Sequence, residues 1–321
     1  MPMSRSLLVV LFVLLSWPAG VQASELYVTN THSGTISVID TTRDEVVATI
    51  PLGGGVPNRV VLTPDGTQAW AIHDKSRVIS IVDVAARKVL RRVKIGEWPY
   101  NLSFTPDGRY CWVLDWGDVS KLLIYDVQKN ALEGEIEVST WPAHGIFSRD
   151  GKLFWVTSET AGNVGVVDVP QRKIVEVLPS SGDAMGLALS ADGQFVYVAN
   201  GEDRTISKVD ARSHRIVATG KVKGVNHDVV LTPDGRLLYV TMRKANRIAV
   251  LRAEDLEAVT EIPQPGYPDL VVMSNDGTKA YVSNRQAHVV TVIGLSDHRE
   301  IKRIPVGKGP HGMALAPPTR Q

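Results

Sequence analysis

The chain has little net charge, one cysteine and no apolar run long enough to span a bilayer. Its 321 residues carry 35 Lys and Arg against 34 Asp and Glu, so it lacks the positive excess of nucleic-acid-binding surfaces. One cysteine excludes a disulfide framework and any CxxC-type zinc or iron–sulfur site. We therefore expect no nucleic-acid partner and a fold stabilised by its core, for which 44% hydrophobic residues are ample.

The longest apolar run lies at the N-terminus and is typical of a secretory signal peptide. It covers residues 7–15, follows Arg5 and precedes Val21-Gln22-Ala23, which fits a small-residue cleavage site. Because a membrane-spanning helix needs about 20 apolar residues, we predict a signal peptide over residues 1–23 that is cleaved near Ala23. An uncleaved N-terminal anchor is the alternative. The mature protein is expected in the periplasm or the medium, with no membrane span.

A turn that ends in Asp-Gly recurs six times along the chain. Asp-Gly between alternating apolar runs is typical of a hairpin, because glycine adopts the positive φ that tight turns need. Each period contains four short apolar segments and no helical periodicity, and four short strands per repeat are the unit of a β-propeller blade. The repeat glycines, at spacings of 42, 43, 42, 42 and 42 residues, are Gly66, Gly108, Gly151, Gly193, Gly235 and Gly277.

The two ends of the mature chain complement each other. Residues 309–316 form an innermost strand with no outer strands after it, and the segment from Leu26 onward forms three strands with no innermost strand before them. We predict an all-β, seven-bladed β-propeller with four antiparallel strands per blade. Its last blade is closed by the N-terminal strands plus the C-terminal strand, which removes the open edges. A single domain then covers residues 24–321.

Three segments carry a resemblance to a known family. Tyr27-Val28-Thr29-Asn30, Tyr197-Val198-Ala199-Asn200 and Tyr281-Val282-Ser283-Asn284 resemble the YVTN family of β-propeller repeat proteins, and the similarity covers the whole mature chain. The resemblance implies a bacterial exported propeller. The family is similar both to propellers associated with quinone-dependent catabolism and to the haem d1 domain of nitrite reductases, although this chain has no CxxCH haem-attachment motif.

One position in each repeat is expected at a mouth of the central channel, where propeller loops converge and ligands usually bind. It lies eight residues before each repeat glycine. The positions are Asn58, Tyr100, Ala143, Met185, His227, Asp269 and, by extrapolation, His311. The residues that follow them are Arg59, Asn101, His144, Gly186, Asp228, Leu270 and Gly312.

Three of these mouth residues are histidines on alternate blades. His144, His227 and His311, with Asp269 or Asp228 beside them, could hold a divalent metal or a haem-like macrocycle, because neutral imidazole binds zinc, copper, iron and nickel. His144 is one position out of register with the other two, which weakens the convergence. The alternative is that these residues satisfy loop carbonyls and channel waters.

Aromatic and basic residues form two further groups on the same face. Trp98, Trp116 and Trp141, with Tyr100, are expected to form an aromatic wall for a flat ligand or a partner's side chain, or else to pack between blades. A basic sector across from them would hold an anionic group, or else form a solvated rim. Its members are Arg204, Arg243, Arg247 and Arg285.

No catalytic motif accompanies these groups. The chain contains no Gly-x-Ser-x-Gly elbow, no His-Glu-x-x-His and no P-loop. We therefore predict a non-catalytic, monomeric scaffold that binds an unknown small ligand or a periplasmic protein through the mouth. Two alternatives remain, a metal- or haem d1-binding propeller and a metal-assisted lyase or hydrolase in the same funnel. Beyond the aromatic and basic groups, the candidate ligand-binding residues are Asn58, Arg59, Asn101, Met185 and Asp228.

Overall fold

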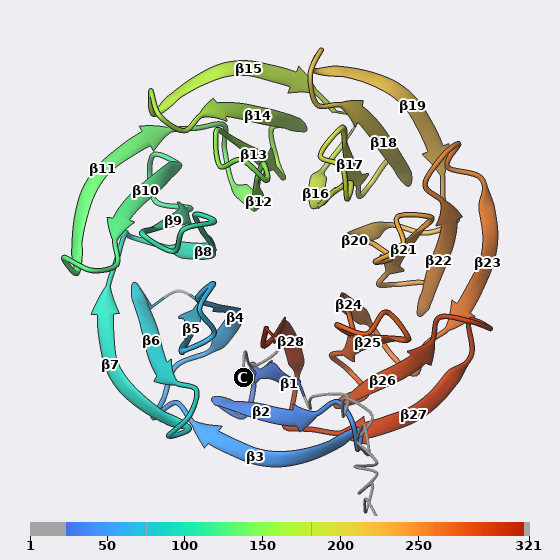
Figure 1. Ribbon diagram of the computed structural model, residues 1–321, viewed down its shortest axis with the longest axis horizontal. Coiled ribbons are helices and arrows are strands. Elements are labelled where there is room, and N and C mark those ends of the chain that lie inside the picture. The colour runs from blue at the N-terminus through green and yellow to red at the C-terminus, as the bar shows by residue number, and fades with distance from the viewer. Residues whose placement is uncertain (1–23, 75, 181, 318–321) are drawn as a thin grey trace, which may run out of the picture.

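Seven four-stranded sheets are arranged in a ring about a central axis (Figure 1). The computed structural model describes residues 24–74, 76–180 and 182–317, and the predicted signal peptide lies outside these residues. All regular elements in the described ranges are strands, so that part of the chain contains no helix long and apolar enough to cross a membrane. The predicted all-β, seven-bladed fold is confirmed.

Each blade is named here by its innermost strand. The β4 blade contains β4 (Pro57–Leu62), β5 (Gln68–His73), β6 (Val78–Asp83) and β7 (Lys88–Lys94); the β8 blade contains β8 (Pro99–Phe104), β9 (Tyr110–Asp115), β10 (Lys121–Asp126) and β11 (Ala131–Glu137). The β12 blade contains β12 (Pro142–Phe147), β13 (Leu153–Ser158), β14 (Asn163–Asp168) and β15 (Lys173–Pro179); the β16 blade contains β16 (Ala184–Leu189), β17 (Phe195–Asn200), β18 (Thr205–Asp210) and β19 (Arg215–Lys221). The β20 blade contains β20 (Asn226–Leu231), β21 (Leu237–Met242), β22 (Arg247–Arg252) and β23 (Ala258–Pro263); the β24 blade contains β24 (Pro268–Met273), β25 (Lys279–Asn284), β26 (Val289–Gly294) and β27 (Glu300–Pro305).

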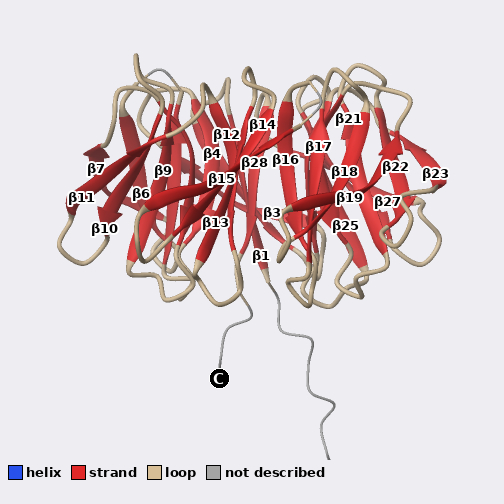
Figure 2. Cartoon of the chain, turned by 90° about the horizontal axis from the view of Figure 1, so that it is seen from above, coloured by secondary structure: helices blue, strands red, loops and turns tan. Residues whose placement is uncertain are grey.

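The seventh blade joins the two ends of the chain. It contains β28 (Pro310–Leu315), β1 (Glu25–Asn30), β2 (Thr35–Asp40) and β3 (Glu45–Pro51), in that order from the channel outward. β28 pairs antiparallel with β1, so that Val28 lies opposite Met313. Strand β1 begins and β28 ends on the same face of the ring, the lower one in Figure 2. The split-blade prediction is confirmed.

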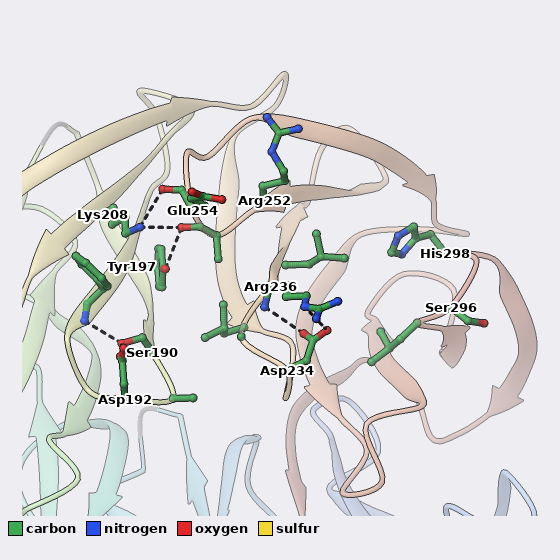
Figure 3. Close-up of a pocket in the computed structure, with 17 residues that line it drawn as sticks. Ser190, Asp192, Tyr197, Lys208, Asp234, Arg236, Arg252, Glu254, Ser296 and His298 are labelled. Carbon is green, nitrogen blue, oxygen red and sulfur yellow. Dashed lines mark hydrogen bonds and ion pairs between the residues drawn. The ribbon is translucent and has the colours of Figure 1, made fainter.

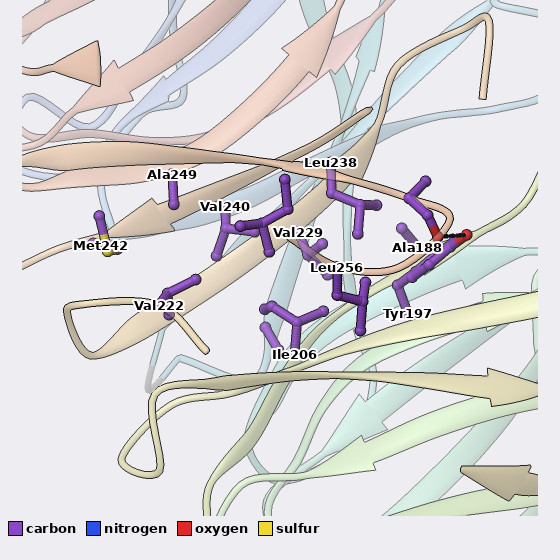
Figure 4. Packing of buried hydrophobic residues seen from close by; sticks show 13 residues of the cluster. Ala188, Tyr197, Ile206, Val222, Val229, Leu238, Val240, Met242, Ala249 and Leu256 are labelled. Atoms are coloured by element: carbon purple, nitrogen blue, oxygen red, sulfur yellow. Dashed lines mark hydrogen bonds between the residues drawn. The ribbon is translucent and has the colours of Figure 1, made fainter. Parts of the chain in front are cut away.

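Apolar residues of neighbouring blades fill the space between them. Between the β16 and β20 blades, Ile206, Leu238 and Leu256 belong to one buried cluster with Tyr197 (Figure 4). The Tyr197 hydroxyl donates to the carbonyl of Ala253 in the next blade, at 3.0 Å. A fully buried Leu or Ile contributes about 1.5–3 kcal/mol to stability. Apolar packing between neighbouring blades therefore holds the ring closed. The tyrosine of the repeat is therefore a packing residue with a hydrogen bond to the adjacent blade.

The last residue of the second strand holds the loop at the mouth face. The Asn30 side chain donates to the hydroxyls of Thr35 and Ser37, at 3.0 and 2.9 Å. Asn200 makes the equivalent pair of bonds in the β16 blade. The asparagine of the repeat thus fixes the hairpin that joins the second strand to the third.

Candidate ligand site at the channel mouth

A β-bulge near the start of each innermost strand shapes the mouth. In β12, Ala143 and His144 together lie between the pairs Pro142↔Ser158 and Gly145↔Val156, so two residues oppose one. The same irregularity occurs in four other blades, and in the β4 and β8 blades a single residue, Asn58 or Tyr100, is skipped in the register. A bulge breaks the strict alternation of side chains and redirects one of them. This explains how His144, one position later in its repeat, lies beside residues of the preceding position.

The three mouth histidines lie in sequence across the channel. The ring centres of His144 and His227 are 5.8 Å apart, and those of His227 and His311 are 6.3 Å apart. His227 and His311 are each 1% exposed and His144 is 9% exposed. The structure therefore brings together three imidazoles from blades that are not adjacent in the ring.

Hydrogen bonds fix which imidazole nitrogen carries the proton. A carbonyl oxygen can only accept, so His227 donates from Nδ1 to the Asp269 carbonyl at 3.1 Å, and His311 donates from Nδ1 to the Asn58 carbonyl at 2.7 Å. Burial, followed by the positive charges of nearby arginines, holds the pKa of all three histidines well below the usual range. They are neutral at pH 7, and Nε2 of His227 and of His311 carries a lone pair.

Arg59 is a buried cation without a carboxylate partner. It is 6% exposed, and its Nη2 donates to Nε2 of His144 at 2.5 Å. Its Nε has no hydrogen-bond partner, and no ion pair joins Arg59 to a carboxylate within the described residues. Burial lowers the pKa of Arg59, and the charges of Asp228 and Asp269 act in the opposite direction. A guanidinium stays charged in proteins, so an unused cationic donor lies in the channel.

Two further arginines neutralise Asp269. Asp269 is completely buried, and its two carboxylate oxygens accept from Nε of Arg243 and Nε of Arg285, each at 2.5 Å. Asp228 accepts from the Val271 amide at 3.0 Å, and burial raises the pKa of its carboxyl group. Arg243 and Arg285 are thus paired with Asp269, and Glu159 also interacts with Arg243, whereas Arg59 has no ion-pair partner among the described residues.

Four hydroxyl side chains on second strands hold the bulges. Thr241 accepts from the Asp228 amide at 2.9 Å and donates to the Asp269 carbonyl of the next blade at 3.1 Å. Thr29, Thr157 and Ser283 repeat this bridge. The equivalent residues of the other three blades are Ile72, Leu114 and Ala199.

The four blades with a hydroxyl bridge are the blades that carry the three histidines and Asp269. Thr29 of the Tyr-Val-Thr-Asn segment is thus a positioning residue for the mouth, a role that was not predicted from the sequence. A Thr or Ser at this position, in place of an apolar residue, is the sequence feature that marks a blade with a hydroxyl bridge.

Close packing at the bulge also requires glycine at one position. A Cβ on Gly312 would lie 2.7 Å from Cα of Arg59. The backbone of β28 therefore approaches β4 more closely than any side chain would allow. This approach places Arg59 next to the strand that carries His311.

The predicted aromatic residues are in mutual contact beside the mouth residue Tyr100. The Tyr100 and Trp116 rings are stacked at 3.7 Å, and the Trp116 and Trp141 rings are stacked at 4.9 Å. Trp98 meets Trp116 edge to face at 5.8 Å. Trp141, at φ 57° and 40% exposed, ends the stack. The four rings therefore pack against one another, and the indole of Trp141 is exposed to solvent.

Within the described residues, four other candidates form no hydrogen bond or ion pair with Arg59 or Asp269. Arg204 is exposed on the loop between β17 and β18, and Arg247 pairs with Glu261 of the outermost strand at 3.7 Å. Asn101 donates to the Ala143 carbonyl at 3.0 Å, a contact between blades. Met185 is buried, and its carbonyl accepts from Thr157.

The contacts of the mouth fit an anion better than a metal ion. Within the part of the chain that the structure describes, no group of three or more His, Cys, Asp or Glu side chains could hold a metal. The Nε2 lone pair of His144 already accepts from Arg59. Arg243 and Arg285 add positive charge that opposes a cation. The haem-like macrocycle stays a prediction.

A cavity on the opposite face was not predicted. It has a volume of about 880 Å³ and lies among the Asp-Gly turns (Figure 3). Lys208 spans one wall and donates to the carbonyls of Ala253 and Glu254, at 3.1 and 2.9 Å. Arg236 and His298 lie on the other side. None of the mouth residues lines this cavity.

Comparisons with known proteins agree with this fold. A family model described as lactonase, 7-bladed beta-propeller, matches residues 96–252, and one described as YNCE-like beta-propeller matches residues 220–317. No curated protein matches the chain. The chain is a seven-bladed β-propeller, and its predicted resemblance to propeller repeat proteins is confirmed.

Solved structures show the same architecture at low identity. A functionally unknown protein from Desulfotomaculum acetoxidans DSM 771 has a TM-score of 0.81 at 16% identity, and the match covers 92% of this chain and 100% of that one. Kuenenia stuttgartiensis hydrazine synthase has a TM-score of 0.77 at 20% identity over 85% and 93% of the chains. Dihydro-heme d1 dehydrogenase NirN has a TM-score of 0.72 at 19% identity over 94% and 78%. These likenesses show the fold.

Proposed function

We propose that this protein is an exported, non-catalytic β-propeller that binds a small anionic ligand at the channel mouth. The observation that carries the proposal is Arg59, a buried guanidinium with an unpartnered Nε and no carboxylate within ion-pair distance among the described residues. A buried charge is costly unless a partner compensates it. An anion bound at Arg59 would supply that partner.

The surroundings of Arg59 suit an anion that enters from the mouth face. The side chains of Arg243 and Arg285 are 21% and 29% exposed, whereas Asp269 between them is fully buried. Positive charge therefore lies both at the surface and deeper in the channel, which steers anions inward. The exposed Trp141 ring offers an apolar face beside this path.

Binding measurements with simple anions test this proposal. Calorimetric titration with acetate, sulfate and phosphate should show saturable binding that Arg59→Met abolishes, because methionine keeps an apolar stem without the charge. Arg247→Met is the matched control, since Arg247 pairs with Glu261 away from the cluster. The proposal fails if none of the anions binds, or if the two variants weaken binding equally. Zinc binding lost in His227→Ala would favour the metal alternative instead.

Hydrolysis is the second candidate, because the matching lactonase model spans His144 and His227. It predicts turnover of a lactone by the purified protein, lost in His227→Asn and retained in His298→Asn. The binding proposal predicts no turnover by either protein.

The export part of the proposal rests on residues 1–23. Fractionation of a bacterium that expresses the full chain should place the protein in the periplasm, with a mature N-terminus near Ser24. A full-length product in the cytoplasm would contradict export and leave the anion site untouched.

A further inference from the structure

We infer that the ligand of the mouth is a hydroxy acid, an anion that also donates a hydrogen bond from a hydroxyl group. The inference rests on the proposed anion site and adds a second group of the ligand, the hydroxyl. Its basis is the pattern of hydrogen-bond acceptors that face the channel beside Arg59.

The first acceptor is Nε2 of His227. Its Nδ1 donates to the Asp269 carbonyl, so Nε2 has a lone pair and no proton. His227 is 1% exposed, and Nε2 has no hydrogen-bond partner. Buried polar atoms are nearly always hydrogen-bonded, so an exception points to a group that is supplied from outside.

The second acceptor is Nε2 of His311. Its Nδ1 donates to the Asn58 carbonyl, and its Nε2 lies 4.0 Å from Oδ2 of Asp269. That oxygen already accepts from Nε of Arg285, so the acceptor left at this contact is Nε2 of His311. A hydroxyl placed beside Nε2 would donate to it.

The charge of the donor follows from its neighbours. Burial is the largest cause of the lowered pKa of His311 and of His227. The positive charges of Arg285, Arg59 and Arg243 lower the pKa of His311 further, and those of Arg243 and Arg59 lower the pKa of His227 further. An ammonium donor would meet the same repulsion. A neutral hydroxyl does not, so it is the donor that the site accepts.

His144 links the cationic donor Arg59 to the acceptor His227. Arg59 bonds to His144, and the His144 ring lies 5.8 Å from that of His227. A single small molecule can therefore place a carboxylate at Arg59 and a hydroxyl at His227. An acid that lacks the hydroxyl would leave the imidazole acceptor unsatisfied, and sites of this kind discriminate against such analogues.

Two pairs of acids that differ by one hydroxyl test the inference. Lactate and propionate, and malate and succinate, are titrated into the full chain and into two variants. The wild type should bind the hydroxy acid of each pair about tenfold more tightly, a difference of about 1.4 kcal/mol. His227→Phe removes the acceptor and should reduce this ratio to about one. His298→Phe, in the cavity on the opposite face, is the control and should retain it.

The outcomes separate the inference from the proposed function. If propionate and lactate bind equally in the wild type, the hydroxy-acid inference is overturned while the anion site stands. If no acid binds, the proposed function itself fails. Should His227→Phe not fold, nitrogen-15 NMR of the wild type decides. The His227 Nε2 resonance should move with lactate and not with propionate, and identical responses would overturn the inference.

Discussion

Arg59 of β4 donates a hydrogen bond to Nε2 of His144 of β12, past the intervening β8 blade. The contact joins two blades that are not adjacent in the ring (Figure 1). It also consumes the lone pair that a metal would need and leaves Nε of Arg59 without a partner. The arrangement orients a cation inside the channel instead of a metal-binding imidazole.

Removal of Arg59 should stabilise the ligand-free protein. A buried charge without a counter-ion costs several kcal/mol, which exceeds the roughly 1.5–3 kcal/mol contributed by the charge-assisted bond from Arg59 to Nε2 of His144. We expect Arg59→Met to raise the free energy of unfolding by about 1 kcal/mol in urea denaturation. Arg247→Met should change it by less than about 0.5 kcal/mol, as is usual at the surface. A loss of 2 kcal/mol or more in Arg59→Met would show that Arg59 serves the fold.

The hydroxyl bridges should contribute to stability. Thr241→Val keeps the side-chain shape and removes the bonds to the Asp228 amide and the Asp269 carbonyl. Since each net hydrogen bond contributes about 0.5–1.5 kcal/mol, we expect a loss of about 1–3 kcal/mol. Thr49→Val on the exposed strand β3 is the control. Equal losses of stability in the two variants would show that the hydroxyl bridge does not stabilise the fold.

Stability should fall as the pH is lowered below about 6.5. Burial lowers the pKa of His73 to about 4 and holds those of His144, His227 and His311 well below their usual range. Between the unfolded and folded values, the unfolded chain binds more protons, so unfolding becomes easier by about 1.4 kcal/mol per pH unit for each histidine.

Urea denaturation at pH 7.5 and pH 5.5 measures this dependence. His227→Asn should lose less free energy of unfolding between these two pH values, because one histidine fewer takes up a proton on unfolding. The same pH dependence in the variant and the wild type would mean that His227 is not a neutral buried imidazole.

Closure of the ring should depend on β28. Deletion from residue 309 onward removes the partner of β1 and the His311 carbonyl that accepts from Ser283, so it leaves open edges. We expect aggregation or a fall in Tm of more than about 10 °C. A circular permutant that joins the ends by a flexible linker and opens at Gly193 retains every strand and should melt near the wild type. An unchanged Tm in the deletion would contradict the split blade.

The aromatic group should divide into a packing part and a surface part. Trp116 lies between Tyr100 and Trp141 and donates to the Pro142 carbonyl at 2.8 Å. Trp116→Ala should therefore cost about 2 kcal/mol or more, whereas Trp141→Ala should cost less than about 1 kcal/mol because its ring is exposed. Thermal denaturation checks both, and the reverse order would show that Trp141 is the packing residue.

The blade count and the split blade could be predicted from the sequence, because an Asp-Gly turn marks each repeat and the spacing leaves little freedom. The mouth residues could be predicted for the same reason. The convergence of His144 with His227 could be predicted only in part, since the bulge that redirects His144 appears only in the strand register. The isolation of Arg59 could not be predicted, because the absence of a counter-ion depends on contacts between distant blades.

The most direct test locates an anion in the crystal. Crystals of the protein soaked in bromide, measured at the bromine absorption edge, should show a strong anomalous peak within hydrogen-bond distance of Nε of Arg59. Arg59→Met crystals should lack that peak and keep any others. Bromide peaks confined to the outer surface, with Arg59 bonded only to His144, would contradict the account.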